Sequence, residues 1–136
     1  SMTEQEPPGD VLAQSTRIQQ DASELGFDWP DVHGVIDKLE EELAELREAV
    51  ALGDSRHVRH ELGDLLLAAV NLARFVGIDP AEALHEANRR FSDRFDQVKR
   101  IVHEEGRDMK TCSLDELEAV WVRVKDHARQ SLEEPP

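Results

Sequence analysis

The chain has 136 residues, which fits one domain with a single hydrophobic core. It carries 30 acidic and 16 basic residues and a formal net charge of −14, which excludes the basic footprint of a nucleic-acid-binding protein. The lone Cys112 excludes an intramolecular disulfide framework, and no apolar run reaches the length of a membrane span. We therefore expect a cytoplasmic protein without nucleic-acid or membrane partners, in which a phosphate-bearing ligand would need metal ions or local arginines.

Helical patterns fill the middle of the chain, and both ends lack them. Residues 1–9 are expected to be disordered, with Ser1-Met2 resembling a cloning scar, and residues 132–136 are expected to fray. Between them we predict a single domain over residues 10–131. No strand pattern or glycine-rich phosphate loop is present, so the fold class is all-α, a bundle of about four to five helices.

The first predicted helix covers residues 11–25 and has only a weak apolar stripe. Gly26 ends it, and Asp28 or Asp31 can cap the next helix, with Pro30 in its first turn. Trp29 lies in this turn. It can be a hydrophobic anchor at the start of the helix or a flat surface for a nucleobase.

Two helices rich in carboxylates follow, the first over residues 31–52 and the second from Asp54 or Ser55 to Gly77. Each has an apolar stripe, with two carboxylates about 60° and 120° to one side of it. The stripes are Ile36, Leu39, Leu43, Leu46 and Val50, and Val58, Leu62, Leu65, Ala69 and Leu72. The carboxylate pairs are Glu42 with Glu45, and Glu61 with Asp64.

The short loop between these helices predicts an antiparallel pair, which would bring the carboxylates together at the margin of the core. Repulsion between them would be relieved by a hard divalent cation, Mg²⁺ or, as a substitute, Mn²⁺. The alternative is that each glutamate lies on a solvated face. Leu67 and Val70 lie away from the stripe, so we expect that face to meet another subunit in a homodimer or higher homo-oligomer with a four-helix-bundle core.

A third long helix is predicted between Asp79-Pro80 and Gly106, with Arg90 and Arg94 one turn apart on one edge and Asn88 on the other. A capping box beginning at Ser113 opens the last helix. Glu82-x-x-His85 is half of the ligand set of a di-iron bundle, and its second copy is missing. The histidines, including His57 and His60, are interpreted as surface or core-edge residues and not as metal ligands.

The acidic pattern Glu41-Glu42-x-x-Glu45 followed by Glu61-x-x-Asp64 resembles that of the MazG family of nucleoside triphosphate pyrophosphohydrolases. The likeness continues through nearly all of residues 11–128, including Gly26-Phe27-Asp28-Trp29-Pro30 and the stretch from Glu86 to Phe95. The chain looks like the carboxy-terminal catalytic half of two-domain members. Arg90 is a departure, because that family often has Lys there. Phosphoribosyl-ATP pyrophosphatases and dimeric dUTPases share this kind of fold and pattern.

The resemblance implies metal-dependent hydrolysis of a nucleoside triphosphate between the α and β phosphates, giving a monophosphate and pyrophosphate. It assigns Glu42, Glu45, Glu61 and Asp64 as metal ligands, and either Glu41 or Glu42 as the base. The implied phosphate contacts are Lys38, Asn88, Arg90 and Arg94. Trp29 is the candidate surface for the nucleobase of the substrate. Alternatives are a phosphoribosyl-ATP pyrophosphatase or dUTPase-like enzyme, a di-iron protein and a non-catalytic helical interaction module.

Overall fold

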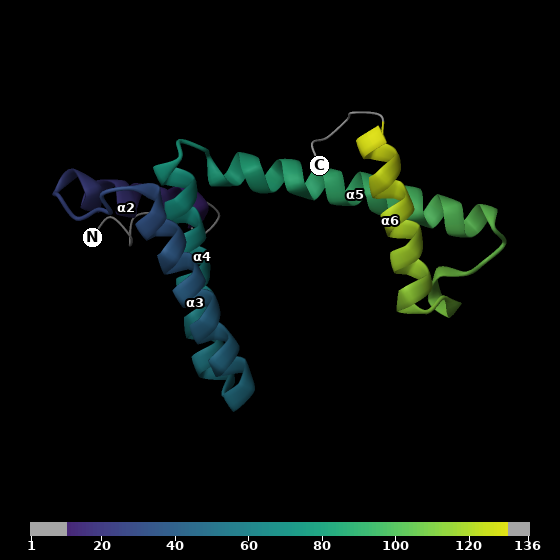
Figure 1. Cartoon of the computed structure of the whole chain (residues 1–136), viewed down its shortest axis with the longest axis horizontal. Helices are drawn as coiled ribbons and strands as arrows, with labels where there is room; N and C mark the ends of the chain where they lie inside the picture. Colours follow the sequence, from purple (N-terminus) through teal and green to yellow (C-terminus); the bar gives the residue numbers. More distant parts are fainter. Residues whose placement is uncertain (1–10, 131–136) are drawn as a thin grey trace. The chain divides into compact units, whose positions relative to one another are not determined.

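A computed structural model describes residues 11–130, which form α-helices and one short 3₁₀ helix and contain no strand. The predicted all-α fold class is confirmed, although the 3₁₀ helix was not predicted. The predictions for residues 1–9 and 132–136 lie outside the described residues. The elements, shown in Figure 1, are α2 (Val11–Glu24), α3 (Val32–Leu52), α4 (Ser55–Phe75), α5 (Pro80–Glu104), η2 (Met109–Thr111) and α6 (Leu114–Gln130).

The helix boundaries follow the capping residues of the sequence. The carboxylate of Asp31 accepts from the backbone N–H of His33 and starts α3, and Asp54 starts α4 in the same way. Gly53 ends α3 in the left-handed region at φ 74°, where a residue with a Cβ would be strained. The predicted capping box is also formed, because the backbone N–H of Glu116 donates to Ser113 Oγ at 3.1 Å.

The chain divides into two compact units, one up to Ala83 and one from Leu84. The first contains α2, α3 and α4, and the second contains most of α5 together with η2 and α6. The second unit has its own core, formed by valines of α5 and α6: Val98, Val102, Val120 and Val124. The single domain over residues 10–131 stays a prediction. None of the described helices is long and apolar enough to cross a bilayer.

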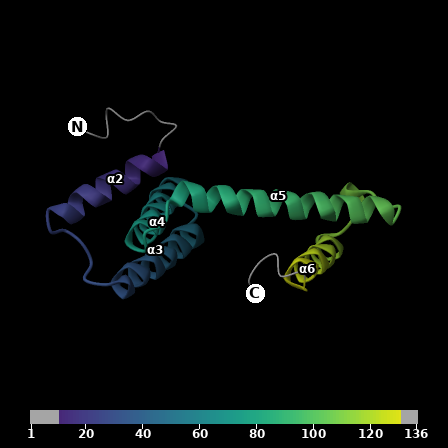
Figure 2. The ribbon, with the colours of Figure 1, turned by 90° about the horizontal axis from the view of Figure 1, so that it is seen from above.

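In the first unit α3 and α4 lie side by side across the short turn at Gly53-Asp54, and α2 packs on α4 (Figures 1 and 2). The buried residues of α3 are Val35, Glu42 and Ala49, which recur every seven positions and so form one line along the helix. On α4, Glu61 and Ala68 are buried with the same spacing. The two helices therefore meet through small apolar residues and two glutamates.

The predicted apolar stripes are not at the centre of this contact, which corrects the sequence interpretation. One side of each stripe is exposed, as Leu43 at 49% and Leu62 at 45% show. The other stripe residues on the side nearer the contact are half-buried: Leu39, Leu46, Val58, Leu65 and Leu72. The distance between packed helices depends on the side chains at the contact, and valine and alanine allow a closer approach than leucine does. The glutamates predicted at the edge of the stripes thus lie at the centre of the contact.

Exposed residues of both predicted stripes lie on one side of the helix pair, and Leu66, one turn after Leu62, lies beside them. Residues that directly follow Val35, Glu42 and Ala49 lie about 100° round the helix from the contact, and so does the residue that follows Glu61. In an antiparallel pair these directions point to the same side. We call this surface the apolar flank, and it consists of Ile36, Leu43, Val50, Leu62 and Leu66, all exposed.

The expectation that Leu67 and Val70 meet another subunit stays a prediction for Leu67, whose side chain is 47% exposed. The Gln19 side-chain amide of α2 donates to the backbone carbonyl of Leu67 at 3.3 Å, and Val70 is only 6% exposed. Since α2 packs on α4, part of this face of α4 is covered within the same chain. The amphipathic α2, whose apolar stripe is weak, supplies part of the cover that the sequence interpretation assigned to a second copy.

Candidate active site

Two buried glutamates face each other between α3 and α4. Glu42 is 5% exposed and Glu61 is 8% exposed. One oxygen of each is held by a basic residue one turn earlier on the same helix: Glu42 Oε1 lies 3.0 Å from Lys38 Nζ, and Glu61 Oε1 lies 3.3 Å from His57 Nε2. The other oxygen of each, Oε2, is buried and has no hydrogen-bond partner among residues 11–130. A buried carboxylate oxygen without a partner is costly, so this arrangement favours a bound cation.

Glu45 completes the cluster. One carboxylate oxygen from each of Glu42, Glu45 and Glu61 can be chosen so that all three atoms lie within 4.8 Å of one another. The pKa of Glu45 is raised above its ordinary value, first because of a hydrogen bond with Glu61, then because of burial and the negative charge of Glu42. The pKa of Lys38 is also raised, because its hydrogen bond to Glu42 stabilises the charged form of the lysine.

The donor set fits a hard divalent cation. All three clustered groups are carboxylates, and carboxylate oxygens suit Mg²⁺ or Mn²⁺ better than soft transition metals. Asp64 lies one turn after Glu61 on α4, and its side chain is 39% exposed. Glu41 is exposed and lies 3.6 Å from Lys38 Nζ, so the same lysine contacts both adjacent glutamates.

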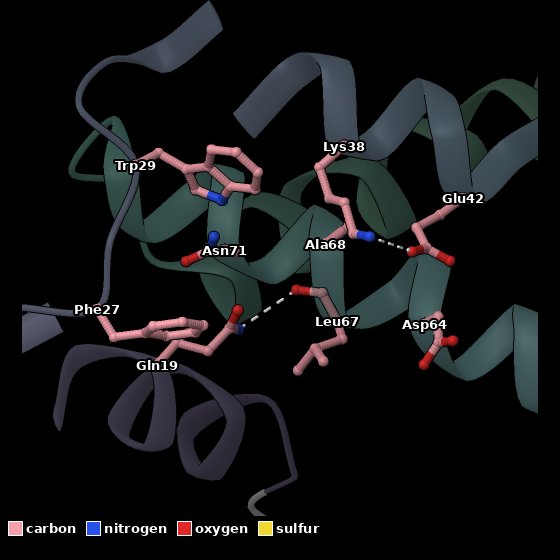
Figure 3. Close-up of a pocket in the computed structure, with 9 residues that line it drawn as sticks. All are labelled: Gln19, Phe27, Trp29, Lys38, Glu42, Asp64, Leu67, Ala68 and Asn71. Atoms are coloured by element: carbon pink, nitrogen blue, oxygen red, sulfur yellow. Dashed lines mark hydrogen bonds and ion pairs between the residues drawn. The ribbon is translucent and has the colours of Figure 1, made fainter. Parts of the chain in front are cut away.

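A cavity of about 470 Å³ opens beside this cluster, on the side of the helix pair opposite the apolar flank. One end is aromatic, with Phe27 and Trp29, and the other is charged, with Lys38, Glu42 and Asp64 (Figure 3). Side-chain amides lie between them, and the remaining lining residues are Gln19, Leu67, Ala68 and Asn71. The cavity thus joins a surface for a flat ring to a surface for charged groups.

Trp29 is held on the first turns of α3 by close contact with Gly34. A Cβ atom at Gly34 would lie 2.8 Å from Trp29 Cε3, so only glycine allows the indole to lie this close to the helix. The preceding Asp28 fixes the loop. Its Oδ1 accepts from Arg74 Nη2 of α4 at 2.7 Å and from the backbone N–H of Trp29 at 2.8 Å, and its Oδ2 accepts from Ser23 of α2 at 2.6 Å. This network ties α2 and the Trp29 loop to α4.

Asp28→Asn is expected to lower the free energy of unfolding by about 2 kcal/mol at pH 7. The pKa of Asp28 is lowered from 3.8 to about 2, first by the hydrogen bond from Arg74. Because the folded-state pKa is the lower one, this stabilisation is present at neutral pH and is lost as the pH falls from 3.8 to about 2. Urea unfolding of wild type and variant at pH 7 and at about pH 2 measures the change.

The matched control is Asp37→Asn, an exposed aspartate on α3, for which we expect a change within about 0.5 kcal/mol at both pH values. If the Asp28→Asn deficit were equally large at low pH, lost packing and not the charge of Asp28 would be its cause.

The structure brings together most of the predicted site residues. The clustered set is Glu42, Glu45 and Glu61, with Lys38, Asp64 and Trp29 around the adjoining cavity. Asn88, Arg90 and Arg94 lie on α5 in the second unit, and their role as phosphate contacts stays a prediction. His85 belongs to none of the groups of metal-capable side chains found among the described residues, so the di-iron ligand half-set gains no support.

Four residues at the site were not predicted: Gln19, Phe27, Asn71 and His57. The signal for His57 is present in the sequence, because it precedes Glu61 by four positions as Lys38 precedes Glu42. Gln19 and Asn71 are brought to the cavity by the packing of α2 on α4, which no local pattern specifies.

Comparison with known proteins gives the family. The model of the MazG nucleotide pyrophosphohydrolase domain matches residues 32–99, a range that contains all the clustered carboxylates. The chain is 41% identical over 115 residues to the nucleoside triphosphate pyrophosphohydrolase/pyrophosphatase MazG of Thermotoga maritima, covering 85% of this chain and 44% of the relative. It is 41% identical over 119 residues to the nucleoside triphosphate pyrophosphohydrolase of Escherichia coli K12, with the same coverage. The chain thus spans less than half the length of these relatives. Because the domain match covers half of this chain, the chain belongs to the MazG nucleotide pyrophosphohydrolase family.

Proposed function

We propose that this chain hydrolyses nucleoside triphosphates between the α and β phosphates, giving a monophosphate and pyrophosphate, with Mg²⁺ as cofactor and Mn²⁺ as a substitute. The observation that carries the proposal is the pair of buried glutamates, each with one oxygen held and the other without a partner among residues 11–130. The names of the relatives from Thermotoga maritima and Escherichia coli support the reaction class.

The metal ligands in this proposal are Glu42, Glu45, Glu61 and Asp64. A bound divalent ion would polarise a phosphoryl oxygen and make a coordinated water more acidic. Lys38 and His57 hold one oxygen of each buried carboxylate, which leaves the other oxygen to bind an ion. We assign Glu41 as the general base that takes the proton of the attacking water, because Glu41 lies outside the cluster and beside Lys38.

The cavity gives the proposed orientation of the substrate. The base would stack on Trp29 at the aromatic end, and the phosphates would extend toward Lys38 and the carboxylates at the charged end (Figure 3). In this orientation the scissile anhydride comes beside the cluster. Asn88, Arg90 and Arg94 are proposed as further phosphate contacts, because two guanidinium groups one turn apart can grip adjacent phosphate oxygens.

The proposed partner is a second copy of this chain on the apolar flank. Large exposed apolar surfaces on a small protein mark interaction sites, and five large apolar side chains line this one. Two antiparallel helix pairs joined through it would form a four-helix core with a two-fold axis. The cytoplasmic location stays a prediction.

The test is a screen of canonical and modified triphosphates, including phosphoribosyl-ATP and dUTP, with Mg²⁺ or chelator, in which pyrophosphate and nucleotide products are measured separately. We expect monophosphate and pyrophosphate in equal amounts, and none with chelator. Turnover confined to phosphoribosyl-ATP or dUTP would establish the corresponding alternative. Release of orthophosphate and a diphosphate, or no turnover of any triphosphate, would contradict the proposal and leave the non-catalytic interaction module.

A further inference from the structure

A histidine stands beside the second carboxylate pair. His60 Nε2 lies 3.3 Å from Asp64 Oδ2. One ring nitrogen of His60 and one carboxylate oxygen from each of Glu61 and Asp64 lie within 4.8 Å of one another. This second group shares Glu61 with the all-oxygen cluster of Glu42 and Glu45, and it differs from that cluster in containing nitrogen.

Helix geometry accounts for the group without any contribution from α3. At about 100° per residue, Asp64 lies about 40° from His60 on one side and about 60° from Glu61 on the other. Asp64 is therefore between the two along the surface of α4, and it lines the cavity. The three ligands come from consecutive turns of one rigid helix.

An exposed histidine and aspartate one turn apart can form a simple surface pair, and such a pair needs no metal. The buried Glu61 distinguishes this group of three residues from such a surface pair. It is only 8% exposed, His57 holds its Oε1, and its Oε2 has no hydrogen-bond partner within the part of the chain that the structure describes. A buried glutamate that keeps one oxygen without a partner, close to an imidazole and a second carboxylate, is stabilised by a bound cation.

We propose that His60, Glu61 and Asp64 form a second metal position, which takes a first-row transition-metal ion such as Zn²⁺ through the imidazole nitrogen. The inference rests on the proposed function in one respect, since Glu61 and Asp64 are also assigned as ligands of Mg²⁺. Imidazole suits Zn²⁺, whereas Mg²⁺ prefers oxygen alone. With bonds of about 2.0–2.2 Å, tetrahedral ligand atoms lie about 3.4 Å apart. The 3.3 Å between His60 and Asp64 matches this separation.

The consequence is competition at the shared carboxylates. Zn²⁺ held by His60 would occupy Glu61 and Asp64 and so lower the affinity of the site for Mg²⁺. Zinc would then inhibit Mg²⁺-dependent pyrophosphate release, and it would inhibit less when the imidazole is absent. His60 would make the metal preference of this chain different from that of an all-carboxylate site.

The experiment is calorimetric titration of the full chain with Zn²⁺, without nucleotide, for wild type, His60→Gln and the control His33→Gln. His33 is an exposed histidine on α3 outside both groups. Loss of a direct ligand should weaken zinc binding by at least about tenfold in His60→Gln, and His33→Gln should bind like wild type. Magnesium binding should be retained in all three proteins.

A second measurement needs no variant. In wild type, the ring resonances of His60 should shift on addition of Zn²⁺, as those of a direct ligand do. Equal zinc affinity in wild type and His60→Gln, or an unmoved His60 ring, overturns the inference even if the chain hydrolyses triphosphates. Zinc binding through His60 in a chain that releases no pyrophosphate would support the inference and contradict the proposed function, so the two failures are distinguishable.

Discussion

Glu61→Gln is expected to abolish pyrophosphate release and to leave the metal-free protein at least as stable as wild type. The amide keeps the shape of the side chain and can still contact His57, but it removes one of three carboxylates that lie within 4.8 Å of one another. The clustered charges repel each other when no cation is bound. Removing one charge therefore relieves repulsion in the folded state and at the same time removes a ligand.

The pH dependence of the metal-free protein follows from Glu45. Its pKa is raised above the ordinary 4.5, first by the hydrogen bond with Glu61. A carboxyl whose folded-state pKa is raised contributes stability at low pH, and this contribution is lost as the pH rises from 4.5 through the folded-state value. With chelator present, the stability of wild type should fall over this range, and Glu61→Gln should show a smaller fall because the first cause of the shift is gone.

Thermal unfolding of wild type, Glu61→Gln and the control Glu40→Gln, each with Mg²⁺ and with chelator, measures these effects. Glu40 is an exposed glutamate on α3 outside the cluster. A ligand at a hundredfold excess over its Kd stabilises the folded state by about 2.7 kcal/mol, which corresponds to a few degrees in Tm. This shift should be present in wild type and Glu40→Gln and strongly reduced in Glu61→Gln. A Glu61→Gln protein that is less stable with chelator and active with Mg²⁺ would show that Glu61 is a structural ion-pair residue.

The ends of the helices could be predicted from the sequence because each is set by a local signal. Asp31, Asp54 and Ser113 accept hydrogen bonds from the first turn that follows, and Gly53 adopts a backbone conformation that favours glycine. Such signals depend on a few neighbouring residues. The carboxylate motif could be predicted for the same reason, since its spacing places both members of each pair on one side of a helix.

The contact face of each helix could not be predicted in this way. A period of 3.6 residues shows which side chains share a line along α3, but the line through Leu43 and the line through Glu42 both repeat every seven residues. The apolar line looks like the core, yet the line with the glutamates is buried. Which of the two lines is buried depends on how closely α3 and α4 can approach each other. That distance is set by both helices together and cannot be read from the sequence of one of them.

The Trp29 loop shows a second limit. Its position depends on the ion pair between Asp28 and Arg74, which are 46 residues apart, and on the missing side chain at Gly34. The sequence allowed Trp29 to be either an anchor or a surface for a nucleobase. In the structure it contacts Gly34 and also lines the cavity, so a packing role and a binding role are compatible.

Leu43→Glu is expected to dissociate the homodimer that we propose. Leu43 is 49% exposed and lies in the middle of the apolar flank on α3. If a second copy covers this flank, the substitution buries a charge without a partner, which costs several kcal/mol in an interface. The Kd of the dimer should therefore rise by at least about a hundredfold. Mass measurement in solution over a range of concentrations, from nanomolar to high micromolar, would detect this change.

The matched control is Leu52→Glu, because Leu52 is 74% exposed and lies about 180° round α3 from Leu43. It carries the same change in charge and side chain outside the apolar flank, so its dimer should have the Kd of wild type. If Leu52→Glu dissociates the assembly as strongly as Leu43→Glu, net charge and not a specific interface is responsible. A wild-type chain that is monomeric at high micromolar concentration would leave the apolar flank without the partner proposed for it. Dissociation by Leu43→Glu alone would place the second copy on the face opposite the cavity, where it would leave the carboxylates accessible to substrate.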